Sequence, residues 1–195
     1  MKKIASPLFQ DLSEAELDTL AAAGHLRTRQ FAKHEVIFRA GSCVREIGIV
    51  LRGSVHIENL DLWGTKSILS SVGAGQAFAE TYAFCGEALM VDAVAAEHCE
   101  ILFLHTAAFT DARIEPALQD KLLRRLLAVS MRKNLSLSQR IFCTTPKTVR
   151  GRLLTYFSAQ AARCGRMEFE VPFNRQQMAD YLNLDRSALS KELCK

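Results

Sequence analysis

The hydrophobic pattern of this 195-residue chain changes its period once, close to residue 110. From about Thr28 to Phe109 apolar residues alternate with polar or small ones, and glycines interrupt the pattern at roughly ten-residue intervals. From Pro116 onward apolar residues recur at the three- and four-residue spacing of helices. This change predicts an α+β chain, with an N-terminal antiparallel β-roll or jelly roll followed by helices.

A short helix is expected before the roll. Ser13 and Glu16 have the S-x-x-E spacing of a capping box, and Gly24 is placed to end the helix.

The longest helical pattern begins at Pro116 and runs for about 25 residues towards Arg140. Its apolar stripe is formed by Leu118, Leu122, Leu126 and Val129. A long stripe needs a covering surface, and a second copy of the helix predicts a dimer interface at these four residues. The β-roll of the same chain is the alternative cover. After this helix, Thr145 and Pro146 are expected to start another one, and residues 167–171 alternate like a short strand.

The last 22 residues have the pattern of two short helices joined by a tight turn. Asn174 and Gln177 are spaced as a capping pair for the first helix, and Asp185 is placed to cap the second. On the second helix Leu189 and Leu193 are expected to face inward. The opposite face is polar and cationic, as a helix in the major groove of DNA must be, and comprises Ser187, Ser190, Lys191 and Cys194. A solvated helical hairpin is the alternative.

Charge is distributed unevenly along the chain. Residues 111–195 hold 16 Lys and Arg against 8 Asp and Glu, whereas residues 1–110 hold 9 against 13. A basic C-terminal half favours phosphate binding. No stretch approaches 18 uninterrupted apolar residues, and acidic residues follow Lys2 and Lys3 too soon for a signal peptide, so we expect a soluble, cytoplasmic protein without a membrane span.

The titratable residues do not indicate an enzyme. The six cysteines lack zinc-finger spacing, so buried, reduced thiols are the default interpretation. The five histidines are scattered rather than clustered with carboxylates as metal ligands. We therefore expect no catalytic residues and no metal site.

The order of these parts resembles the Crp/Fnr family of transcription regulators. Residues 33–41 and 49–55 are similar to that family's cyclic-nucleotide-binding-type repeat, residues 75–80 to its effector cassette, and residues 175–193 to its helix-turn-helix. The resemblance implies a β-roll sensor at 1–115, a dimerisation helix and hinge at 116–143 and a helix-turn-helix domain at 144–195. The family continues with a two-stranded wing, so the chain is expected to be truncated at Lys195.

The function that the resemblance implies is a homodimeric regulator that binds a palindromic operator in double-stranded DNA and responds to an effector in the roll. It also admits RNA polymerase as a partner. The residues expected to contact DNA are Arg186, Ser187, Ser190 and Lys191, with Arg175 and Lys147 on phosphates. A small-molecule-binding β-barrel protein without DNA binding is the alternative.

The expected effector is a small molecule or a redox signal other than cyclic AMP. Members that bind cyclic AMP carry an Arg-Ser pair after the cassette, whereas this chain has Met90 and Val91 there, and neither supplies a cation for a phosphodiester. We expect an apolar pocket lined by Phe78, Glu80, Tyr82, Phe84, Met90 and Val91. A collapsed pocket with these side chains in the core is the alternative.

The cofactor is unknown. The iron–sulfur members of the family carry a cluster of N-terminal cysteines, whereas the first cysteine here is Cys43, so an iron–sulfur cluster is not expected. Haem is not expected either.

Overall fold

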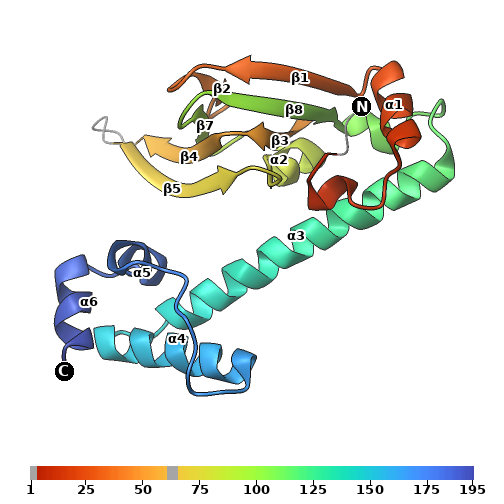
Figure 1. Ribbon diagram of the computed structural model, residues 1–195. Coiled ribbons are helices and arrows are strands. Elements are labelled where there is room, and N and C mark those ends of the chain that lie inside the picture. Colours follow the sequence, from red (N-terminus) through yellow and green to blue (C-terminus); the bar gives the residue numbers. More distant parts are fainter. Residues whose placement is uncertain (1–3, 61–65) are drawn as a thin grey trace. The chain divides into compact units, whose positions relative to one another are not determined.

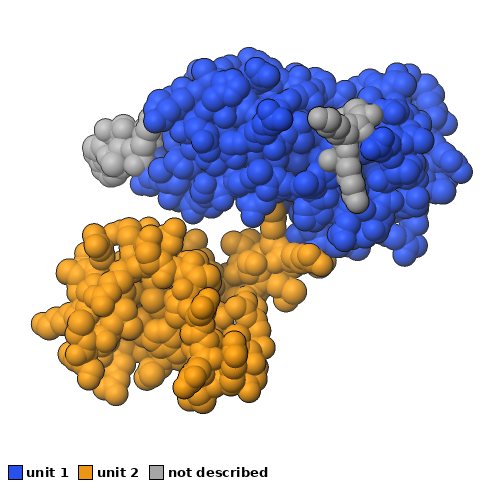
Figure 2. Space-filling view, in the orientation of Figure 1, with its two compact units in different colours: residues 1–130 blue, residues 131–195 orange. Residues whose placement is uncertain are grey.

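The computed structural model describes residues 4–60 and 66–195 (Figure 1). They form two compact units, residues 1–130 and residues 131–195, which Figure 2 distinguishes by colour. The boundary falls inside the long helix α3, Pro116–Thr144. None of the helices in the described ranges is long and apolar enough to cross a membrane.

Unit 1 contains two antiparallel four-stranded sheets, as the alternating pattern predicts. One sheet has the order β1-β8-β3-β6 and the other the order β2-β7-β4-β5. The strands are β1 (Leu26–Phe31), β2 (Val36–Phe38), β3 (Glu46–Arg52), β4 (Ser54–Leu60), β5 (Lys66–Gly73), β6 (Ala77–Phe78), β7 (Asp92–Ala95) and β8 (Cys99–His105).

The central strands β3 and β8 are buried on both faces. Ile101 and Phe103 belong to the core between the two sheets, whereas Leu102 and Leu104 point to the other side of their sheet, as the two-residue period of a strand requires. Helical segments cover that outer side with apolar residues such as Leu20. They are η1 (Pro7–Phe9), α1 (Glu14–Ala22), η2 (Thr106–Phe109) and the first turns of α3.

The interior of the roll is filled by aromatic rings. Phe38 lies 5.8 Å from Phe78 and 5.6 Å from Phe103 between ring centroids. Phe78 lies directly against the backbone of Gly48, where an added Cβ would be only 2.3 Å from the Phe78 ring. Glycine at position 48 is therefore required for this packing.

Local capping signals were predicted well. Ser13 and Glu16 form the capping box of α1, and Gly24 adopts the left-handed conformation directly after it. Asn174 and Gln177 form the same reciprocal pair in unit 2.

Unit 2 contains the end of α3 and three further helices around one apolar core. These are α4 (Val149–Cys164), α5 (Arg175–Leu182) and α6 (Arg186–Leu193). The core comprises Cys143, Leu153, Tyr156, Met178, Ala179, Leu182 and Leu189.

Two local predictions in unit 2 were wrong. The cap of α4 is Thr148 rather than Thr145, because α3 continues to Thr144 and the hydroxyl of Thr145 donates to the carbonyl of Ile141 at the end of that helix. Residues 167–171 form no strand, and in this part of the described chain no second strand lies beside them to pair with.

Candidate functional site

The exposed face of α6 carries the polar and cationic side chains expected there. The Asp185 carboxylate accepts hydrogen bonds from the backbone N–H groups of Ser187 (2.8 Å) and Ala188 (3.0 Å) and so starts the helix. Leu189 is completely buried beneath α6, while Arg186 and Lys191 are exposed. Ser187 is also exposed and Ser190 is half-buried.

The first turn of α6 is stabilised by hydrogen bonds to the Asp185 carboxylate. The hydroxyl of Ser187 donates to Asp185, and this bond together with the two backbone N–H groups lowers the pKa of the Asp185 carboxyl. The cap therefore carries its negative charge at the positive end of the helix. Ser187 is a component of this cap as well as of the exposed face.

The other predicted DNA contacts lie on different elements. Arg175 is the first residue of α5, and Lys147 lies in the connection between α3 and α4; both are exposed. Leu193 was expected to face inward but is 38% exposed. Because it belongs to the last turn of α6, the unit 2 core formed around Leu189 does not cover it.

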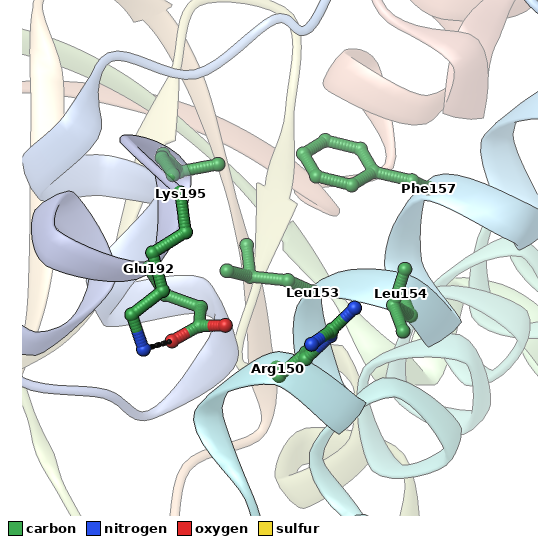
Figure 3. Close-up of a pocket in the computed structure, with 7 residues that line it drawn as sticks. Arg150, Leu153, Leu154, Phe157, Glu192 and Lys195 are labelled. Carbon is green, nitrogen blue, oxygen red and sulfur yellow. Dashed lines mark hydrogen bonds and ion pairs between the residues drawn. The ribbon is translucent and has the colours of Figure 1, made fainter.

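A cavity of about 270 Å³ lies between α4 and the end of α6, where no sequence pattern predicts one. Figure 3 shows side chains of α4 on one side and Glu192 and Lys195 on the other, joined by an ion pair of 2.9 Å. Its lining comprises Arg150, Leu153, Leu154, Phe157, Glu192, Leu193 and Lys195. The exposed Leu193 is thus part of the lining of a cavity that combines apolar and charged side chains.

The structure separates the residues expected to line an effector pocket. Phe78, the last residue of β6, and Glu80, the first residue of the short helix α2 (Glu80–Cys85), are both buried. Tyr82 packs against the core of the roll. Phe84, in contrast, is half exposed, and its ring packs edge-on against Phe109 on the outside. These side chains therefore do not line a single pocket.

The Met90-Val91 pair also departs from the expected wall. Met90 is 77% exposed and Val91 is half-buried. The short loop around Met90 is held by the backbone bond between Gly41 and Leu89, which leaves the Met90 side chain in solvent. Met90 is therefore not a pocket wall in this structure.

The leucines expected at a dimer interface are already covered. Leu118, Leu122 and Leu126 lie in the core of unit 1, and Val129 is half-buried. The same chain therefore provides the covering surface, which was the alternative considered for this stripe. A second apolar stripe on α3 is exposed and comprises Leu123, Leu127, Met131, Leu135, Leu137, Ile141 and Phe142.

One polar cluster was missed by the sequence analysis. The buried His25 ring lies 2.7 Å from the Asp111 carboxylate, measured from Nε2 to Oδ2. Hydrogen bonds from Arg113, together with the one from His25, hold the pKa of Asp111 well below its usual range. The two groups are 86 residues apart, so no local pattern marks them. Across residues 4–60 and 66–195 no group of three or more His, Cys, Asp or Glu side chains is arranged to hold a metal ion.

Comparisons with known proteins agree with the architecture of unit 1. Residues 28–113 match the family model of the cyclic nucleotide-binding domain. The roll has the fold of a cyclic nucleotide-binding domain. No curated protein matches the sequence significantly.

Solved structures similar to this chain include transcription regulators. The N-terminal domain of a transcriptional regulator from Streptomyces coelicolor A3(2) has 20% identity and a TM-score of 0.56, covering 68% of this chain and 92% of that one. The catabolite activator protein of Thermus thermophilus has 24% identity and a TM-score of 0.53, covering 97% of this chain and 85% of that one. FixK2 of Bradyrhizobium japonicum has 18% identity and a TM-score of 0.56, covering 87% of this chain and 83% of that one. At these identities the similarity concerns the fold of the cyclic nucleotide-binding domain and the helices after it.

Proposed function

We propose that this protein is a dimeric DNA-binding transcription regulator in which the cyclic nucleotide-binding domain is the sensor. The observation that carries the proposal is α6, a capped helix with a buried Leu189 on one side and exposed Arg186 and Lys191 on the other. It follows α5 after a three-residue turn, which is the spacing of a helix-turn-helix. The basic C-terminal half supports phosphate contacts around it.

The proposed DNA contacts fall into two groups, according to the part of the chain that carries them. Arg186, Lys191, Ser187 and Ser190 on α6 are proposed to reach base edges, since a recognition helix reads bases from its outer face. Arg175 and Lys147 are proposed to bind phosphates. Operators should then contain two half-sites about 34 Å apart, one for each recognition helix of a dimer.

The dimer interface is proposed on the exposed stripe of α3. Leu127 and Leu122 are five residues apart, so they project from different sides of the helix. Since the side with Leu122 is covered by unit 1, the side with Leu127, Met131 and Leu135 is available to a second copy. RNA polymerase remains a proposed further partner.

The direct test is fluorescence anisotropy with duplex DNA at two salt concentrations. The protein should bind and lose affinity steeply with salt. Lys191→Ala should weaken specific binding by roughly 1–3 kcal/mol and relax the preference at one base pair. Absence of binding at low salt would favour the alternative, a ligand-binding β-roll protein without DNA binding.

The effector is proposed to be a small molecule or redox signal other than cyclic AMP. By the family resemblance, Met90 and Val91 replace the Arg-Ser pair of members that bind cyclic AMP and supply no cation, and burying an unpaired phosphodiester charge is costly. The buried Glu80 carboxylate is suited to a hydroxyl group rather than to a phosphate. Calorimetric titration should detect no micromolar binding of cyclic AMP or cyclic GMP; such binding would contradict this part of the proposal.

A further inference from the structure

The C-terminal end of α5 is an electron-rich surface inside unit 2. The last carbonyl groups of a helix have no partner within the helix and form the negative end of its dipole. After Leu182 the chain turns through Asn183 in the left-handed conformation, and the Leu184 amide bonds back to the carbonyl of Ala179. The Asp180 carbonyl accepts the Asn183 amide at 3.3 Å, and the carbonyls of residues 181–183 are left for partners from other elements.

Two arginines supply these partners. Arg140, near the end of α3, donates from Nε to the Tyr181 carbonyl (3.0 Å) and from Nη2 to that of Asp180 (2.9 Å). Its guanidinium also lies 5.9 Å from the centre of the Tyr181 ring. Arg152, on α4, donates from Nη1 to the carbonyls of Leu182 (3.0 Å) and Asn183 (2.7 Å).

Arg152 has a second attachment. Its Nε donates to the Pro146 carbonyl (2.8 Å), in the connection between α3 and α4. A single planar guanidinium therefore ties this connection to the turn that leads into α6. Four successive carbonyls before α6 are held by cations that come from α3 and α4.

We propose that Arg140 and Arg152 are positioning residues that set the orientation of α6 through the carbonyls of the α5–α6 turn. The inference rests on the DNA-binding function proposed above and deepens it. It also gives these two arginines a role different from the phosphate contacts proposed for Arg175 and Lys147, because their bonds are directed to the protein's own backbone. No local sequence pattern marks these bonds, because the carbonyls of the turn lie 30 to 41 residues from the two arginines.

The test uses Arg140→Lys and Arg152→Lys in the full chain. Lysine keeps the positive charge, but its single ammonium cannot reproduce the planar fork that bridges two carbonyls. The matched control is Arg150→Lys, because Arg150 is exposed on the same helix as Arg152 and has no hydrogen bond to the described part of the chain. Affinities are measured by anisotropy for a duplex selected from a random library by the wild-type protein and for unselected random duplex, across a salt series.

Both positioning variants should bind the selected duplex roughly tenfold more weakly. Affinity for random duplex and the slope of affinity against salt should stay unchanged, and Arg150→Lys should behave as wild type. Loss of folded protein would lower both affinities by one common factor, and a direct phosphate contact would change the salt slope; either result would overturn the proposal. Unchanged binding of the selected duplex would do so too.

A second measurement needs no DNA. Amide hydrogen exchange at Asn183 and Leu184 should be faster in both positioning variants than in wild type and Arg150→Lys, because the turn loses its carbonyl partners. Equal exchange rates in all four proteins would overturn the positioning role. If the wild-type protein binds no DNA at all, the proposed function fails, whereas the exchange experiment still decides whether the two arginines hold the turn.

Discussion

The two halves of α3 are both rich in apolar residues, yet they differ in what covers them. In the first half, which belongs to unit 1, Leu118, Leu122 and Leu126 are packed against the roll and its N-terminal helices. In the second half, which belongs to unit 2, Leu135 and Ile141 are about two-thirds exposed. The difference shows that an apolar stripe predicts that a helix side will be covered, but not whether the cover is its own chain or a partner.

The largest expected effect lies in the first half of α3. Leu122→Ala should lower the free energy of unfolding of unit 1 by roughly 2–5 kcal/mol, because a fully buried side chain leaves a cavity. Leu135→Ala removes the same atoms from an exposed site and should change the free energy of unfolding by less than about 0.5 kcal/mol. Urea unfolding at a concentration where the protein is monomeric measures both. Equal losses would mean that the second half is covered within the chain.

The second prediction separates assembly from stability. Leu127→Glu should weaken dimerisation by roughly 3 kcal/mol, about 100-fold in the dissociation constant, because two like charges meet across the proposed interface. Ser136→Glu is the matched control: nine residues are two and a half helical turns, so Ser136 projects from the opposite side. Analytical ultracentrifugation reports the outcome. A wild-type protein that sediments as a monomer at micromolar concentration would contradict the proposed dimer.

The smallest effect concerns the turn that leads into α3. The pKa of Asp111 is lowered mainly by Arg113 and further by His25, so this carboxyl stabilises the folded state above its unfolded pKa of about 3.9. That stabilisation is lost as the pH falls below this value. Asp111→Asn should therefore reduce the acid sensitivity of unit 1 between about pH 5 and pH 2, as followed by thermal unfolding. An unaltered pH profile would show that the cluster does not contribute to stability.

The sequence by itself determined the features that depend on neighbours along the chain. The change of period near residue 110 predicted antiparallel sheets followed by helices. The caps at Ser13, Asn174 and Asp185 were predicted correctly because a cap is formed by groups within three residues of one another. The two-residue alternation correctly marked Ile47 and Ile49 of β3 as buried, but it grouped Val50 with the polar positions, although Val50 is fully buried on the other face of the strand.

Only the tertiary structure decided what depends on distant contacts. It determined which stripe of α3 is buried, that Met90 lies in solvent, and that Arg140 and Arg152 bind carbonyls of the turn before α6. The physical reason is the same in each case. Periodicity and charge indicate that a side chain needs an apolar cover or a polar partner. The residues that supply the cover or the partner are brought close only by folding.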